Sequence, residues 1–279
     1  VQRVIFIPAD TVGRAVEIIQ RVERKELGLE CFALNSFDLA ALLAEDPTQD
    51  GKLRKGKYVG ISGAKPWAAK QIAQFERLRG ILPPWTVVIV LAGWARHAED
   101  KVEYQELDIR DLATEFGFEI KNTVGGISGL DKIIKEEVLL PWRLQRRFGY
   151  KGSCHGLIFH ARPDRVLELE AAIAEVASKY HYPTSDIGGY LVPIERARTI
   201  YCEYDLHCNL DDPVDSQRVK ALFEEASKVL VDRGAFFDRP YGPWAEIMYS
   251  RAGTYTEYLK KVKKRLDPNN IMNPGKLCF

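Results

Sequence analysis

The same order of strands and helices occurs twice along this chain, and that repetition restricts the folds open to it. The predicted strands comprise residues 1–8, 29–34 and 85–93 in the first half and residues 156–160, 189–195 and 199–209 in the second. Helices with apolar residues at helical spacing are predicted between and after these strands, and Asp10, Ser36 and Asp212 can cap three of them. A glycine-rich stretch at 123–129 and an irregular basic stretch at 141–152 separate the halves.

Two halves of this kind predict an α+β fold. The expected architecture is a pair of ferredoxin-like modules, about residues 1–122 and 154–252, that share one antiparallel sheet with helices on one face. A C-terminal helix and an extended tail follow, in residues 253–279.

The balance of charge argues against two classes of partner. The 279 residues include 40 Lys+Arg and 39 Asp+Glu, a net charge of +1, which does not favour nucleic acid or an anionic membrane surface. No apolar run approaches the ~18–20 residues of a membrane span, and no signal peptide is visible. The five cysteines include no CxxC pair, which does not favour a disulfide framework. A reducing, cytoplasmic location is therefore expected.

The end of the chain carries its most specific motif. Tyr255, Tyr258, Leu259, Val262 and Leu266 recur at helical spacing, with basic residues on the other side. Asp267-Pro268 should end this helix, because the residue before proline avoids the α region. The proline- and asparagine-rich residues that follow predict an extended tail laid across another surface.

The run LKKVKKRLDPNNIMNPGKL, residues 259–277, resembles the C-terminal signature of FAD-linked oxidases. These form the vanillyl-alcohol-oxidase and p-cresol-methylhydroxylase superfamily, which includes D-lactate and glycolate dehydrogenases. The region from the Asp212 helix through Gly234 to Arg251 is similar to its aryl-alcohol branch. In this superfamily one domain binds FAD, a ferredoxin-like cap domain covers the flavin and shapes the substrate pocket, and the C-terminal tail returns to the FAD domain.

The resemblance implies that residues 1–252 are the substrate-binding cap domain and that residues 253–279 pack on an FAD-binding domain. Asn273 and Lys276 of the tail, and His155, are the residues expected to contact the cofactor. A glycine-rich loop that would cradle the FAD pyrophosphate is not found in the sequence; residues 60–63 and 125–129 are expected to be turns. The FAD-binding domain should then be a separate subunit or another part of a longer protein, and this chain alone should be inactive.

The strand at residues 199–209 offers the clearest candidate site. Alternation places Cys202, Tyr204, Leu206 and Cys208 on one face, for packing against helices. Tyr201, Glu203, Asp205 and His207 lie on the other, which faces either solvent or the flavin. Glu203 and His207 are the candidates for the base that takes a substrate proton. A metal site and a merely solvated polar face are the alternatives.

A second candidate lies in the aromatic, proline-containing segment 234–248. Arg239 is a fixed donor among aromatic residues that include Tyr241, and both are expected at the substrate pocket. In the aryl-alcohol branch a Tyr-Arg pair near this place holds a phenolate; Arg239 aligns with that arginine, whereas Asp238 stands in the tyrosine position. Alternatively, Arg239 pairs with Asp238 or Glu246 and only shapes the loop.

The expected function is therefore that of the substrate part of an FAD-dependent oxidoreductase. It would oxidise a small, aromatic alcohol or hydroxy acid by hydride transfer to the flavin. The lactate and glycolate dehydrogenase branch carries a His-x-Gly-Asp-Gly-Asn-x-His metal motif that this sequence lacks, so no metal is expected. The alternatives are a 2-hydroxyacid dehydrogenase of that branch and a non-catalytic partner subunit of a flavoprotein. An electron-acceptor protein is a further expected partner, and the protein is expected to form an oligomer.

Overall fold

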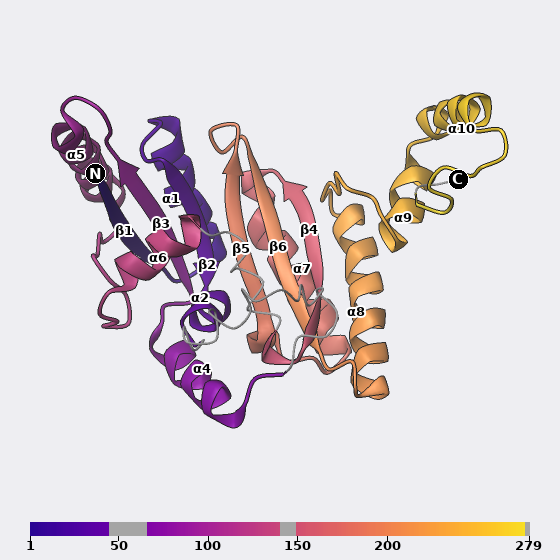
Figure 1. Ribbon diagram of the computed structural model, residues 1–279, viewed down its shortest axis with the longest axis horizontal. Helices are drawn as coiled ribbons and strands as arrows, with labels where there is room; N and C mark the ends of the chain where they lie inside the picture. Colours follow the sequence, from indigo (N-terminus) through magenta and orange to yellow (C-terminus); the bar gives the residue numbers. More distant parts are fainter. Residues whose placement is uncertain (45–65, 140–148, 277–279) are drawn as a thin grey trace, which may run out of the picture.

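The computed structural model describes residues 1–44, 66–139 and 149–276. Six strands in this part of the chain form one sheet with the order β1-β3-β2-β5-β6-β4 (Figure 1). All neighbouring strands are antiparallel, as predicted. The strands are β1 (Gln2–Ala9), β2 (Glu30–Asn35), β3 (Trp85–Ala92), β4 (Ser153–Ala161), β5 (Ile187–Ile194) and β6 (Thr199–Cys208).

Nine α-helices accompany the sheet in the described ranges, together with short 3-10 turns at Pro163–Arg165 and Thr184–Asp186. The helices of the first half are α1 (Val12–Arg24), α2 (Ser36–Leu43), α4 (Ala69–Ile81), α5 (Ala98–Phe116) and α6 (Leu130–Leu139). Those of the second half are α7 (Val166–Lys179), α8 (Pro213–Asp232), α9 (Pro243–Arg251) and α10 (Thr254–Leu266). None of the described helices is long and apolar enough to cross a membrane.

The two halves repeat one ferredoxin-like pattern. In the first, β1 lies between β3 and an isolated antiparallel bridge from Phe6 to Lys121, which takes the place of a fourth strand. In the second, β4 lies between β6 and a matching bridge from His160 to Phe236. Each half therefore has the order strand, helix, two strands, helix, short edge segment, which confirms the prediction of two ferredoxin-like modules.

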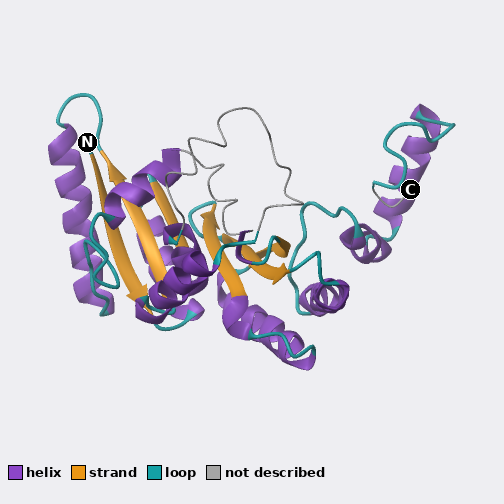
Figure 2. Cartoon of the chain, turned by 60° about the horizontal axis from the view of Figure 1, so that its bottom comes forward, coloured by secondary structure: helices purple, strands orange, loops and turns teal. Residues whose placement is uncertain are grey.

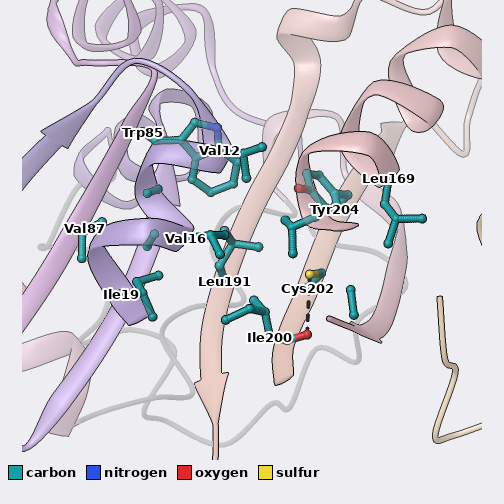
Figure 3. Packing of buried hydrophobic residues seen from close by; sticks show 14 of the residues in the cluster. Val12, Val16, Ile19, Trp85, Val87, Leu169, Leu191, Ile200, Cys202 and Tyr204 are labelled. Atoms are coloured by element: carbon teal, nitrogen blue, oxygen red, sulfur yellow. Dashed lines mark hydrogen bonds between the residues drawn. The ribbon is translucent and has the colours of Figure 1, made fainter. Parts of the chain in front are cut away.

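The modules are joined through β2 and β5. Only two Cα pairs, Ala33 with Leu191 and Leu34 with Tyr190, connect these strands. Side chains extend the junction: Trp85 of β3 lies edge-on to Tyr204 of β6, with ring centroids 6.5 Å apart. Figure 3 shows Trp85, Tyr204 and Leu191 in one buried cluster that spans both modules.

One face of the sheet is covered by helices along its whole width. Helices α1, α5, α7 and α8 bury their apolar residues there, including Val16, Leu169 and Leu222. The helix-facing residues of β6 are Cys202, Tyr204, Leu206 and Cys208, all buried, as the alternation predicts.

The opposite face is covered mainly over the first module, a layer that the prediction of helices on one face did not include. Helices α2, α4 and α6 pack against β1, β3 and β2, where Phe6, Leu34 and Val88 are buried. Helix α2 also reaches the start of β5. Helix α2 also covers the His207 end of β6 on this face, through Phe37. We call the remaining part, around Tyr201 and Glu203 of β6 and His160 of β4, the open face (Figure 2 shows the sheet from a turned view).

Helices α9 and α10 stand apart from the sheet at the end of the chain (Figures 1 and 2). Helix α9 contacts α8, whereas Tyr255, Tyr258 and Leu266 of α10 are exposed. The tail folds into turns instead of running extended as predicted. Its course is fixed by Asp267, whose carboxylate accepts hydrogen bonds from the backbone N–H groups of Ile271 and Met272, each at 2.9 Å, and pairs with Lys263.

Candidate functional site

The open face of β5, β6 and β4 carries polar and aromatic side chains in register. Tyr201 and Glu203 of β6 lie opposite His160 and Ile158 of β4, and Glu203 also lies opposite Tyr190 of β5. The Tyr201 hydroxyl donates a hydrogen bond to Glu203 at 3.0 Å. The Tyr201 ring meets the His160 ring edge-on, with centroids 5.8 Å apart. This end of the open face therefore holds a carboxylate, a phenol and an imidazole side by side.

The segment after α8 adds Asp238 to this group. Phe236 exchanges both backbone hydrogen bonds with His160, at 2.7 and 2.9 Å. Asp238 follows two residues after Phe236, and its Oδ2 lies 3.4 Å from His160 Nε2. Phe237, which lies between Phe236 and Asp238 in the sequence, is turned to the helix-covered face and packs against Phe159 and Trp244.

Arg239 and Tyr241 lie at the rim of this arrangement. The Arg239 side chain is 77% exposed, and its Nε lies 3.7 Å from Asp238 Oδ2. Tyr241 is 59% exposed. The aromatic residues of segment 234–248 are divided between two environments, because Phe237 is buried in the core while Phe236 and Tyr241 are exposed. The pairing of Arg239 with Asp238 is one of the two arrangements that the sequence left open.

His207 occupies a different environment at the other end of β6. It is fully buried and stacks on Phe37 of α2, with ring centroids 4.7 Å apart and planes 27° apart. Tyr150 meets the same ring edge-on at 5.6 Å. The Tyr182 hydroxyl donates to the His207 carbonyl at 3.1 Å and accepts from its N–H at 2.8 Å. His207 is thus part of a packed aromatic cluster, below the surface on which Glu203 lies.

Asp205 lies on β6 between Glu203 and His207, and its neighbours on both adjacent strands are glycines. Gly156 of β4 and Gly188 of β5 are its cross-strand partners. A Cβ on Gly188 would come within 2.6 Å of Asp38 Oδ1, and one on Gly156 within 3.1 Å of Asp205 Oδ1. The glycines make room for two buried carboxylates, Asp38 and Asp205, where α2 meets the sheet.

A charged group borders the aromatic cluster. Asp186 pairs with Lys151 at 3.1 Å and with Arg79 of α4 at 3.2 Å. Burial, with Asp186 nearby, raises the pKa of Tyr150 to about 12, so its hydroxyl stays protonated at neutral pH. These contacts join α4, Lys151 ahead of β4, and the turn that leads into the start of β5.

The three residues expected at the cofactor lie elsewhere. His155 of β4 is opposite Leu206, on the helix-covered face, and its ring lies 5.3 Å from that of Phe223 in α8. Burial, and Lys220 nearby, lower the pKa of His155. Asn273 and Lys276 are exposed on the tail, with Asn273 in the left-handed region at a φ of 50°.

Among the described residues, His, Cys, Asp and Glu side chains form no group of three or more that could hold a metal ion.

Sequence reasoning gave His160 no definite role and did not include Asp38 or Tyr150 in a site. The register of β4 against β6 was the missing information, because an uncertain strand start leaves the face of His160 undetermined.

Comparisons with known proteins agree with the geometry. The family model "FAD linked oxidases, C-terminal domain" matches residues 244–277. p-Cresol methylhydroxylase, solved with substrate bound, is similar with a TM-score of 0.68 and 16% identity, over 99% of this chain and 52% of that one. 4-Ethylphenol oxidase from Gulosibacter chungangensis, solved with isoeugenol, gives a TM-score of 0.66 and 14% identity, over 99% and 53%.

An alkyldihydroxyacetonephosphate synthase is also similar, with a TM-score of 0.51 and 12% identity, over 99% of this chain and 45% of that one. No protein with a curated function matches the sequence. This chain spans about half the length of the oxidase structures that it matches. At these identities the structural similarity concerns the fold, while the match at residues 244–277 concerns the sequence. Residues 244–277 of this chain therefore match the C-terminal domain of the FAD-linked oxidases, and the chain as a whole has the fold seen in p-cresol methylhydroxylase and 4-ethylphenol oxidase.

Proposed function

We propose that this chain is the substrate-side part of an FAD-dependent oxidoreductase and that its open face covers the flavin and the bound substrate. The observation that carries the proposal is the open face itself. One face of the second module is buried under α7 and α8, while the other carries Tyr201 and Glu203 as half-buried side chains. A half-covered sheet with ordered polar groups is suited to a partner surface.

The residues of the open face fit a flavin and a small substrate. Tyr190 and Tyr201 supply aromatic surface, with ring centroids 6.4 Å apart. Glu203 supplies a carboxylate that can accept a proton. When bound, FAD supplies the acceptor for a hydride; this chain would orient the substrate and exclude water above the ring.

The expected site residues would lie at different distances from the substrate in this proposal. Glu203 lies on the open face and would touch the substrate. Arg239 and Tyr241 at the rim would contact an anionic or aromatic substrate as it enters, since both are exposed in this chain. His207 would support the floor of the site through its stacking on Phe37. A small, aromatic alcohol or hydroxy acid is the substrate class that suits aromatic surface, an arginine and a base.

Helix α10 and the tail would dock on the FAD-binding domain, with Asn273 and Lys276 near the cofactor. The apolar side chains Tyr255, Tyr258 and Leu266 of α10, and Ile271 and Met272 of the tail, are exposed here. Exposed apolar groups on one amphipathic helix are typical of an interface. Asp267 fixes the turn that carries Ile271 and Met272, so the tail is shaped before it docks.

The test is reconstitution with an FAD-binding domain, supplied as another part of the same polypeptide or as a separate subunit. The proposal predicts a yellow complex whose flavin absorbance bleaches when an aromatic alcohol or hydroxy acid is added without oxygen. A yellow complex that no such substrate bleaches would indicate a non-catalytic partner subunit. A chain that stays colourless in every pairing would contradict the proposal.

A further inference from the structure

We infer that His160, held by Asp238, is the group that takes the hydroxyl proton of the substrate. This inference rests on the proposed function and adds to it a residue pair that neither the fold nor the comparisons assign. Its basis is the 3.4 Å separation between His160 Nε2 and Asp238 Oδ2 on the open face. A carboxylate beside one imidazole nitrogen fixes the ring and favours the tautomer that leaves the other nitrogen unprotonated.

The backbone explains why the two residues meet. His160 and Phe236 form a bridge with both hydrogen bonds, so the edge segment is locked to β4 at this position. Phe237 is fixed by burial against Phe159 and Trp244, which prevents the segment from rotating about its axis. Asp238 follows two residues after the bridge, in a bend, and its carboxylate lies beside the His160 ring. The pair is thus anchored by β4 on one side and by the bridged Phe236 on the other.

The surroundings of His160 suit a proton acceptor. Its side chain is 21% exposed, so part of the ring is accessible to solvent. The charged and titratable groups around it are Asp238 and Arg239 on the edge segment, Tyr201 and Glu203 on β6, and Tyr190 on β5. Arg239 Nε lies 3.7 Å from the same Asp238 carboxylate. His207 is fully buried, so it does not offer an accessible nitrogen in this arrangement.

The Asp238 carboxylate lies beside Nε2–H of His160, and Nδ1 of His160 would accept the proton of the substrate O–H. The O–H bond and the carbinol C–H bond break, the hydride leaves to the flavin, and a C=O bond forms. The substrate loses two electrons and two hydrogens, and His160 becomes an imidazolium paired with the Asp238 carboxylate. An alcohol or hydroxy acid fits this step, because its oxidation releases one hydride and one hydroxyl proton.

The first test needs no flavin. In this chain, ¹⁵N NMR of the imidazole rings should show the neutral His160 ring protonated on Nε2. Asp238→Ala should produce a mixture of the two tautomers at His160. Asp100→Ala removes the other histidine–aspartate pair, His97 with Asp100 at 2.9 Å on α5, and serves as the matched control. It should leave the His160 signals unchanged. An unchanged tautomer in Asp238→Ala would overturn the role of Asp238.

The second test uses the reconstituted flavin complex. His160→Gln should lower kcat by about 10²–10⁴-fold with little change in KM, and should abolish the loss of rate at acid pH that protonation of a base causes. His97→Gln should change neither. If wild type bleaches and His160→Gln retains both its rate and its pH profile, His160 is not the proton acceptor, while the proposed function stands. A wild-type complex that never bleaches overturns both.

Discussion

Trp85 of the first module packs directly over Gly189 of the second, so closely that a Cβ on Gly189 would lie 2.8 Å from the Trp85 ring. The same Cβ would lie 3.0 Å from the Asn35 side chain, whose amide donates to the Ile187 carbonyl at 2.8 Å. Because only two Cα pairs join β2 to β5, this packing carries much of the junction. The open face keeps its shape only if the two modules stay in register.

Gly189→Ala should therefore destabilise the chain by about 1–3 kcal/mol, because the buried Trp85 ring must move away. Urea unfolding monitored by Trp fluorescence measures the change. Gly80→Ala in α4 is the control, since a Cβ there meets nothing within 4 Å and alanine favours helix. An unfolding free energy that is the same in both variants would contradict the close contact at Gly189.

Glu170 of α7 lies at the same junction and should make stability depend on pH. Burial raises its pKa to about 7, partly offset by a hydrogen bond with Trp85. A carboxyl group with a raised folded pKa stabilises the fold most below its unfolded value near 4.5, and that contribution is lost as pH rises through about 7. The pKa difference corresponds to at most about 3 kcal/mol.

Glu170→Gln should accordingly raise the unfolding free energy at pH 8 and have little effect at pH 4, as measured by urea unfolding across this range. Glu168→Gln, two residues away and paired with Arg165 at 2.8 Å, is the control for loss of a charge on α7. Equal effects of Glu170→Gln at the two pH values would show that folding does not raise the pKa of Glu170.

The turn at Asp267 should be lost in strong acid before the sheet unfolds. Lys263, and the N–H groups of Ile271 and Met272, lower the pKa of Asp267 to about 2. Because this folded pKa is depressed, the contribution is present above the unfolded value near 3.8 and is lost as pH falls through about 2. Hydrogen exchange should show the Ile271 and Met272 amides protected at pH 4 and unprotected in Asp267→Ala. Protection that survives in Asp267→Ala would contradict the assignment of the turn to this carboxylate.

Helix α10 should matter for assembly and not for folding of the chain. Tyr258 is 64% exposed, so Tyr258→Asp should leave thermal unfolding unchanged while weakening binding to the FAD-binding domain at least about tenfold. Tyr104→Asp is the matched control, because Tyr104 is a 68% exposed tyrosine on α5 of the other module. Calorimetric titration of each variant with the FAD-binding domain measures the two affinities. Equal affinities would show that the interface lies elsewhere.

The strands and the two-module plan could be predicted from the sequence because both depend on local alternation and on helix spacing. The second layer on the first module could not, since α6 is short and follows a glycine-rich stretch that suggests only a turn. The tail was expected to be extended because its prolines and asparagines were visible, whereas the Asp267 carboxylate that folds it acts on backbone groups four and five residues away.

For the site, alternation correctly divided β6 into a core face and a polar face. It did not predict that His207 is buried under Phe37, because α2 comes from the other module. Nor could it bring Asp238 to His160, which requires the bridge between residues 76 positions apart in the chain. Contacts of that kind depend on register and on module packing, and a single sequence specifies neither.

The most direct test of the central claim is to map which face of the sheet covers the flavin. The reconstituted complex would be loaded with 8-azido-FAD, irradiated, digested and analysed by mass spectrometry for flavin-labelled peptides. The open face predicts labels in β4, β6 or the Asp238 segment, at residues such as Tyr201, Glu203 and His160. Labels confined to α7 or α8, on the opposite face, would contradict the account.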